Sequence, residues 1–220
     1  MKRAHRIRLI MSLIVVLFIA AVPVSKQPIP SFIDSRPPSV EAAAVMARLD
    51  SLQIKGRAPK TGYERAQFGD GWAIVDGCDM RNIILSRDLA ATQLNERCQV
   101  ESGVLNDPYT GVRIHFTRGA ATSGAIQIDH VVALSNAWQT GAQLLSKVER
   151  EQLANDPLEL LAVDGAANQQ KSDGDAATWL PKNTAFRCAY VSRQVAVKVK
   201  YHLWVTPAEK TAIGRILDQC

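Results

Sequence analysis

The stretch IQIDHVVALSNAW (residues 126–138) places an acid and an imidazole side by side in an apolar, β-branched run. The chain has only four histidines, and one of them, His130, directly follows Asp129. The β-branched content of the run predicts a strand. Neighbouring side chains of a strand point to opposite faces, so Asp129 and His130 can share a site only if the strand ends or bulges there. An isolated Asp–His pair is also compatible with an ordinary surface or core contact, so the rest of the chain has to decide.

The N-terminus has the layout of an export signal. A basic segment, MKRAHRIR, precedes an apolar run over residues 9–22 that is short for a membrane span. Residues 1–24 are therefore predicted to be a signal peptide or, because Pro23 makes the cleavage site unclear, an uncleaved signal anchor. We expect a secreted or extracytoplasmic protein, held at the cell surface if the segment is retained. Any membrane contact would then be made through this segment alone.

Most of the net charge belongs to that N-terminal segment. The chain carries a formal charge of +5, and four basic residues without an acid lie in the first eight positions, so their removal leaves +1. Attraction to a polyanion must then come from local basic patches instead of a global field. The hydrophobic content of 47% in 220 residues is enough for the core of one ordinary domain, which we place at residues 39–220.

Four cysteines in an exported chain indicate disulfides, for which three pairings are possible. The pairs Cys78–Cys98 and Cys188–Cys220 are favoured because each closes a local loop within one half of the chain. No CxxC pair occurs, so we expect no structural zinc site.

The remaining segments follow from periodicity and from helix and turn signals. Residues 25–38 contain four prolines and are predicted to be a linker, followed by an Ala-rich helix over 39–54. Strands are predicted in VRIHFT (residues 112–117), IQIDHVV (126–132) and NDPLELLAVDG (155–165), with a helix over 134–151 and a short one in 167–179. Helices are predicted over 184–220, although VAVKVKYHLW alternates as a strand would. Thr206, Pro207 and Glu209 give the last helix an N-cap, an N1 proline and a capping box.

Three polar elements fall at the joints of one strand–turn–helix unit. Asp129–His130 ends one strand, Asn155 precedes the next, and Asn168 begins the following helix. Carboxylate and amide oxygens are hard donors that suit Mg²⁺ or Mn²⁺ with several waters retained. A neutral histidine beside such an ion can take a proton from water near neutral pH. The order of these residues predicts a hydrolytic metal site.

The same residues carry a family resemblance. The segments DHVVAL, NDPLEL and NQQKSD are similar to the three parts of the HNH, or ββα-metal, nuclease signature, with Asn in place of the final His. From residue 62 onward the chain resembles the exported bacterial HNH endonuclease family related to the C-terminal nuclease domain of GmrSD-type restriction enzymes. The supporting stretches include TGYERAQFG, GCDMRN, DPYTG, IDHVVALSNAW and ANDPLELLAVDGAANQQKSDGDAATWLP.

This resemblance implies an α+β fold and an endonuclease activity. The fold would have a ββα-metal core over residues 126–180, a short antiparallel sheet, surrounding helices and disulfide staples. His130 would be the general base, Asn155 would orient its loop, and Asp129 with Asn168 would bind one divalent metal. The substrate would be DNA, with RNA as a second candidate, cut to leave 5′-phosphate and 3′-hydroxyl ends. We expect low sequence specificity because the sequence contains no recognition helix and no ladder of aromatic side chains for base stacking.

Candidate phosphate contacts are Lys171, Arg81, Arg187 and Arg193. Lys171 lies three residues after Asn168 on the same helix face, and Arg81 lies in the stretch GCDMRN of the resemblance. Arg187 and Arg193 belong to a basic run without acids between Asp175 and Glu209, which offers positive charge for backbone binding or forms a solvated helix face. Asp173 and Asp175 are either second metal ligands or surface carboxylates.

Two other functions stay open at this point. A non-catalytic, exported nucleic-acid or cell-surface binding protein could share the frame, although the complete set of four site residues argues against it. A hydrolase of another anionic polymer would use similar chemistry. Serine hydrolase chemistry is disfavoured because no GxSxG motif occurs. We expect a monomer without an obligate protein partner.

Overall fold

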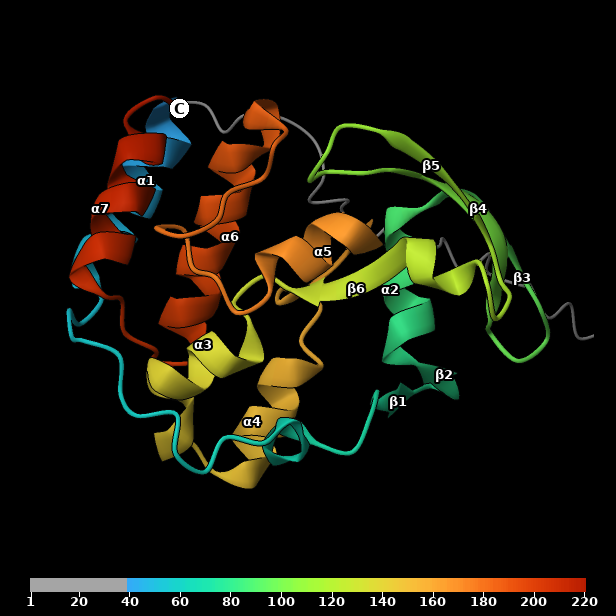
Figure 1. Cartoon of the computed structure of the whole chain (residues 1–220), viewed down its shortest axis with the longest axis horizontal. Coiled ribbons are helices and arrows are strands. Elements are labelled where there is room, and N and C mark those ends of the chain that lie inside the picture. The colour runs from blue at the N-terminus through green and yellow to red at the C-terminus, as the bar shows by residue number, and fades with distance from the viewer. Residues whose placement is uncertain (1–38) are drawn as a thin grey trace, which may run out of the picture.

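The computed structural model describes residues 39–220, so the signal segment and the linker predicted for residues 1–38 lie outside the described residues. Figure 1 shows a β-rich half, which holds β3, β4 and β5, and a helical half, which holds α1, α6 and α7, with β6 and α5 between them. This is the α+β class with small antiparallel sheets that was predicted. No helix within residues 39–220 is long and apolar enough to cross a membrane.

A ββα unit lies between the two halves. β6 (Ile126–His130) pairs antiparallel with β7 (Leu160–Asp164), in a register that sets His130 opposite Leu160. α5 (Gly165–Lys171) follows β7 directly, and the side chain of Asp164 caps it by accepting from the amide of Ala167 at 2.7 Å. The chain between the two strands forms α3 (Leu134–Gln139), η3 (Ala142–Leu144) and α4 (Lys147–Ala154). The predicted strand, turn and helix order is confirmed.

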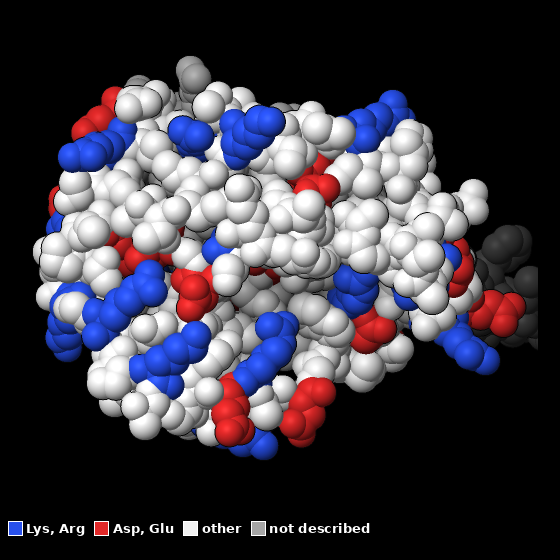
Figure 2. Space-filling model, in the orientation of Figure 1, with Lys and Arg blue, Asp and Glu red and all other residues white. Residues whose placement is uncertain are grey.

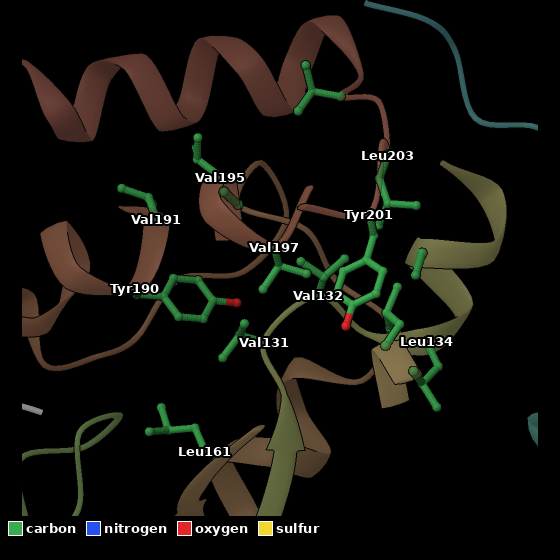
Figure 3. Close-up of a cluster of buried hydrophobic side chains, with 14 of the residues drawn as sticks. Val131, Val132, Leu134, Leu161, Tyr190, Val191, Val195, Val197, Tyr201 and Leu203 are labelled. Carbon is green, nitrogen blue, oxygen red and sulfur yellow. The ribbon is translucent and has the colours of Figure 1, made fainter. Parts of the chain in front are cut away.

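The two faces of the β6–β7 pair belong to different hydrophobic cores. Alternation points Ile126, Ile128 and Leu160 into the core of the β-rich half, whereas Leu161 and Val163 enter the core of the helical half. Figure 3 shows this second core, where Tyr190, Val191 and the neighbouring apolar side chains of one helix lie near Val131, Val132 and Leu161. The strand end at His130 is thus fixed from both sides by buried apolar contacts.

The β-rich half consists of α2 and the strands around it. α2 (Met80–Asp88) packs beside β6 and β7 and is followed by the antiparallel sheet β3 (Ala90–Leu94), β4 (Val100–Asn106) and β5 (Arg113–Thr117). The short pair β1 (Ile74–Val75) and β2 (Cys78–Asp79) precedes α2, and η2 (Ser123–Ala125) leads into β6. The Cys78–Cys98 disulfide joins β2 to the turn between β3 and β4, as predicted.

The helical half is formed by α1 (Ser39–Ser51), α6 (Arg187–Lys200) and α7 (Pro207–Leu217), with the 3₁₀ turn η4 (Thr184–Phe186) before α6. The second predicted disulfide, Cys188–Cys220, links the start of α6 to the C-terminus. Thr206 and Glu209 form the predicted capping box of α7. The stretch that alternated like a strand is helical up to Lys200, and α1 ends at Ser51, three residues before the predicted end.

The single helix predicted over residues 134–151 is wrong, because the chain breaks after Gln139. Gly141 adopts φ 130°, a left-handed conformation that interrupts an α-helix, and a Cβ there would lie 3.3 Å from the Trp204 ring. Ser146 then starts α4 with a capping box to Glu149. The break separates α3, which contains Ser135, from α4, which ends at Ala154.

The first residue of α5 has to be glycine because the helix begins against backbone. A Cβ at Gly165 would lie 2.2 Å from the carbonyl oxygen of Gly124, below any real contact distance. Substitution Gly165→Ala should therefore push α5 away from β6 and lower the free energy of unfolding by about 1–3 kcal/mol. Urea denaturation measures the change.

Gly124→Ala is the matched control, because nothing lies within 4 Å of a Cβ placed there. Equal stability of the two variants would show that α5 is not positioned by this contact.

Candidate functional site

A cavity follows the unpaired edge of β6. Within residues 39–220, β6 pairs only with β7, so its other edge carries no strand. A cavity of about 640 Å³ lies there, called here the edge cavity, and it is lined by Lys60, Tyr63, Arg65, Trp72, Arg81, Gln127, Ile128, Asp129, His130, Ala133, Leu134, Ser135, Asn168, Gln169, Ser172 and Asp173. Because His130 is the last residue of β6, Asp129 and His130 line one cavity although a strand alternates its side chains.

Asp129 is buried and held by two donors. The Tyr109 hydroxyl donates to Oδ2, and the Lys171 ammonium donates to Oδ1 at 2.9 Å. Lys171 also donates to the backbone carbonyl of His130 at 2.8 Å. The ion pair joins α5 to the end of β6 and fixes the direction of the carboxylate.

The His130 ring is held by one hydrogen bond and one stacked ring. Nε2 lies 3.0 Å from the carbonyl oxygen of Ala154, which only accepts, so Nε2 carries the proton. The ring lies parallel to Trp72, with centroids 5.9 Å apart and 6° between planes. Nδ1 makes no hydrogen bond to the described residues. The free lone pair is therefore on Nδ1, which fits a base.

Burial keeps this ring neutral. Desolvation is the main cause that lowers the pKa of His130 to about 3, and the charges of Arg65 and Lys171 act in the same direction. The hydrogen bond to Ala154 opposes the shift in part. His130 is thus unprotonated over the whole neutral range, although it is also a weak base in this state of the protein.

Asn155 connects the two chain segments that touch His130. Its Oδ1 accepts from the amide of Ala73 at 2.7 Å, and its Nδ2 donates to the carbonyl of Glu151 at 3.0 Å. Ala73 follows the stacked Trp72, and Asn155 itself follows Ala154. Asn155 therefore lies where it can fix the surroundings of the histidine ring, and its orienting role stays a prediction.

The loop after Asn155 is held by two arginines. The Arg193 guanidinium donates to the carbonyls of Pro157, Leu158 and Leu160 at 2.5–2.7 Å. Arg87 donates to the carbonyls of Pro157 and Leu160 at 2.7 Å and pairs with the neighbouring Asp88. These contacts satisfy backbone acceptors in the turn that leads into β7.

Asn168 faces the edge cavity from α5. Its Nδ2 donates to Gln127 Oε1 at 3.0 Å, and Gln127 lies two residues before Asp129 on the same strand face. With its nitrogen engaged in this way, Asn168 leaves its carbonyl oxygen without a protein donor. Both asparagines and both residues of the Asp–His pair thus lie at or beside the strand end.

The donor set fits a hard cation held by few protein ligands. No group of three or more His, Cys, Asp or Glu side chains suited to a metal occurs within residues 39–220. A cation in the edge cavity would be held by Asp129 and the Asn168 oxygen, because each carboxylate oxygen can accept a second contact. Mg²⁺ commonly binds through one or two carboxylates and keeps several waters. Lys171 already balances the Asp129 charge, which would weaken the attraction for such a cation.

A second buried acid lies behind the strand end. Glu159 accepts from the amide of Val132 at 3.2 Å. Desolvation raises its pKa well above the ordinary value, and this hydrogen bond and the charge of Lys171 oppose the shift. Glu159 does not line the edge cavity, so it takes no part in the site described here.

The structure places three of the predicted phosphate contacts away from the edge cavity. Lys171 is 2% exposed and forms an ion pair with Asp129 at 2.9 Å, so its ammonium does not reach the surface where a substrate phosphate would bind. Arg193 is buried at the turn before β7, and Arg187 is half-buried and donates to the carbonyl of Pro181 at 2.8 Å. None of Lys171, Arg187 and Arg193 lines the edge cavity. The basic run is not one solvated face, because Lys198 is also buried against Glu209 at 3.0 Å.

Arg81 does lie at the site, together with residues that the sequence did not single out. Arg81 lines the edge cavity and donates weakly to the carbonyls of Ser123 and Ile126, both at 3.4 Å. Figure 2 shows this face hollowed near its middle, with Lys and Arg side chains on both sides of the hollow. The functional residues missed from sequence are Arg65, Trp72, Tyr109 and Gln127. Arg65, Trp72 and Tyr109 lie in or beside segments quoted for the resemblance. No motif spacing distinguished these three residues from their neighbours.

The two candidate second ligands have other partners. Asp175 is 4% exposed and pairs with Arg57 at 2.8 Å. Asp173 lines the edge cavity but accepts from Ser135 at 3.2 Å and from Lys60 at 3.4 Å. These contacts account for both carboxylates as parts of ion pairs.

Substitution Lys171→Met should strongly destabilise the protein. It leaves the buried Asp129 carboxylate without its counter-charge and the His130 carbonyl without a donor, which costs about 3–5 kcal/mol. Urea denaturation measures the loss. Lys147→Met removes a lysine whose side chain is 66% exposed and should change stability little; similar values for the two variants would contradict a structural role of the buried ion pair.

The His130 ring should take up a proton only near pH 3 in the metal-free protein. The unfolded chain takes up that proton near pH 6.5, so the group costs stability progressively as pH falls below 6.5 and has no effect above it. Replacement His130→Gln can place an amide nitrogen where Nε2 donates to Ala154, and it cannot become charged. Its stability should therefore fall less than that of the wild type between pH 7 and pH 4.5. An NMR titration that finds the His130 ring protonated at pH 6 would contradict the burial argument.

The comparisons with known proteins show the family of the chain and one secreted relative. A protein of Arthroderma benhamiae named an uncharacterized secreted protein is 35% identical over 188 residues, which cover 84% of this chain and 89% of that protein. No solved structure matches the chain. The family model described as the C-terminal domain of GmrSD restriction endonucleases matches residues 80–216, which include β6, β7 and α5. The chain therefore belongs to the family of GmrSD restriction endonuclease C-terminal domains.

Proposed function

We propose that this protein is a secreted, metal-dependent HNH endonuclease that hydrolyses phosphodiester bonds of DNA, with RNA as a second candidate. The observation that carries the proposal is the state of His130. Its Nε2 proton is committed to Ala154, its Nδ1 is free, and the ring borders a cavity that also holds Asp129 and Asn168. A neutral imidazole fixed in one tautomer is what general-base catalysis requires.

In the proposed reaction, His130 Nδ1 removes a proton from a water molecule as its oxygen attacks the phosphorus. The new oxygen–phosphorus bond forms in line with the bond to the 3′ oxygen, which breaks and leaves a 5′-phosphate and a 3′-hydroxyl. Solvent supplies the proton that the leaving oxygen takes up. A divalent cation held by Asp129 and Asn168 would neutralise negative charge on the phosphate and on the leaving oxygen.

The other side chains of the site would hold the base in position. Ala154 and Trp72 define the direction and plane of the ring, and Asn155 joins their two segments through the amide of Ala73. Such fixed geometry lowers the reorganisation needed at the moment of reaction.

Secretion is supported by the layout of the first residues and by the secreted relative. Two disulfides, Cys78–Cys98 and Cys188–Cys220, fit an oxidising compartment. The protein would therefore meet nucleic acid outside the cytoplasm.

The variant His130→Ala should lower the turnover of plasmid and single-stranded DNA by roughly 100-fold or more, the scale of general-base catalysis. Cleavage is followed on gels with Mg²⁺, with Mn²⁺ and with EDTA, which should abolish it. The matched control is His115→Ala, which removes an exposed histidine on β5 and should keep full activity.

Circular dichroism and oligonucleotide binding should match those of the wild type. Full activity of His130→Ala would contradict the proposal. A folded wild-type protein that binds nucleic acid but cleaves neither DNA nor RNA with any of these metals would favour a binding protein instead.

A further inference from the structure

Two cavities meet at His130. Beside the edge cavity lies a second cavity of about 400 Å³, called here the histidine cavity, which is lined by Arg65, Ala66, Phe68, Gly69, Asp70, Gly71, Trp72, His130, Leu134 and Ala154. Both cavities are lined by His130, Trp72, Leu134 and Arg65. Arg65 is the one cation among the four shared residues.

The other cations that line the edge cavity are already engaged. Lys60 pairs with Asp173 at 3.4 Å, and Arg81 donates to two backbone carbonyls. Arg65 is exposed, and its guanidinium makes no hydrogen bond or ion pair with any residue from 39 to 220. An arginine with five unused donors that borders the base is ready to receive an anion.

The backbone that carries Arg65 is anchored although its side chain is free. Arg65 begins the 3₁₀ turn η1 (Arg65–Phe68), and Phe68 is buried in the helical core. The Arg150 guanidinium donates to the carbonyl of Gln67 at 2.9 Å and to its side chain at 3.1 Å. Gly69 then ends the turn at φ 101°. The position of Arg65 beside His130 is thus preset by packing.

Arg65 also lies outside the residues that match the family model, which begin at residue 80. Arg65 belongs to the stretch TGYERAQFG, which supports the resemblance to this family, and it lines a cavity whose Asp129, His130 and Asn168 lie within the matched residues. The match to the family model assigns no role to Arg65.

We propose that Arg65 binds the phosphate group on which His130 acts, by donating to its non-bridging oxygens; this assignment rests on the proposed nuclease function. The planar guanidinium can donate two parallel hydrogen bonds to two oxygens of one phosphate, and it stays charged in water. Because negative charge grows on these oxygens during attack, the contact strengthens in the transition state. Arg65 would then serve both binding and turnover.

The binding test uses the full-length chain with His130→Ala in EDTA, so that the probe is not cut. The probe is a fluorescein-labelled single-stranded oligothymidylate followed by anisotropy at low salt. Adding Arg65→Ala should raise its Kd about 10-fold or more, the effect expected for a charge-assisted contact. Arg65→Lys should lie between the two. The control Arg215→Ala, on the exposed end of α7, should leave the Kd unchanged.

The turnover test uses the same substitutions with His130 intact. Arg65→Ala should lower kcat/KM at least as much as it weakens binding, with part of the loss in kcat. Added guanidinium ion should restore part of the activity of Arg65→Ala and none of His130→Ala. A merely structural role would not respond to this rescue.

The outcomes separate the two proposals. If the wild type cleaves DNA and Arg65→Ala behaves as Arg215→Ala in both tests, Arg65 is not a phosphate ligand although the nuclease function stands. If the wild type does not cleave but Arg65→Ala loses oligonucleotide binding and Arg215→Ala does not, the anion site stands without the nuclease function. Equal loss in the Arg65 and Arg215 variants, or no binding by the His130→Ala chain, overturns the assignment of Arg65.

Discussion

The buried ion pair between Lys171 and Asp129 is the constraint on which the site depends. It joins the last residue of α5 to the penultimate residue of β6, and the same ammonium reaches the carbonyl of His130. Burying two charges is costly. The short distance between them, the hydrogen bond from Tyr109 to Asp129 and the hydrogen bond from Lys171 to the His130 carbonyl offset that cost. An ion pair of this kind fixes one arrangement, because any displacement of α5 leaves a charge unpaired in the interior. Gly165, which lets α5 begin against the Gly124 carbonyl, serves the same arrangement.

A second set of contacts controls the histidine, and it comes from the opposite side of the strand. Ala154 and Trp72 belong to segments far apart in sequence, and Asn155 joins them with one short hydrogen bond. Arg193 adds rigidity by binding the carbonyls of the following turn. The Asp129 carboxylate and the His130 ring are therefore held by different contacts, the first through α5 and the second through the turn before β7. The division follows from strand alternation, which sends neighbouring side chains to opposite faces.

Much of the fold and of the site could be predicted from the sequence because the signals were local. Local patterns predicted the strands and helices around Asp129–His130, Asn155 and Asn168, and the family resemblance implied that they form a ββα unit. The two disulfide pairs were favoured because each closes a local loop within one half of the chain. The structure differs from the predictions in the surroundings of several charged residues and in one helix break. Lys171 and Arg193 looked like surface cations, since their buried partners, Asp129 and the carbonyls before β7, lie 42 and 33 to 36 residues away in sequence. The capping box at Ser146 was a visible sign of the helix break, but Gly141 gave no sign of its contact with Trp204.

The sequence by itself determined which chemical groups are available and on which elements they lie. An acid and an imidazole at a strand end, an asparagine in a turn and another on a helix can be read directly, because periodicity and capping act over a few residues. Only the tertiary structure decided which groups face the cavity and which form ion pairs or hydrogen bonds in the interior. It turned Lys171 inward, left Arg65 free, and set Trp72 against His130. The physical reason is that burial and pairing depend on residues brought together from distant parts of the chain, and their desolvation and partners have no signature in local sequence.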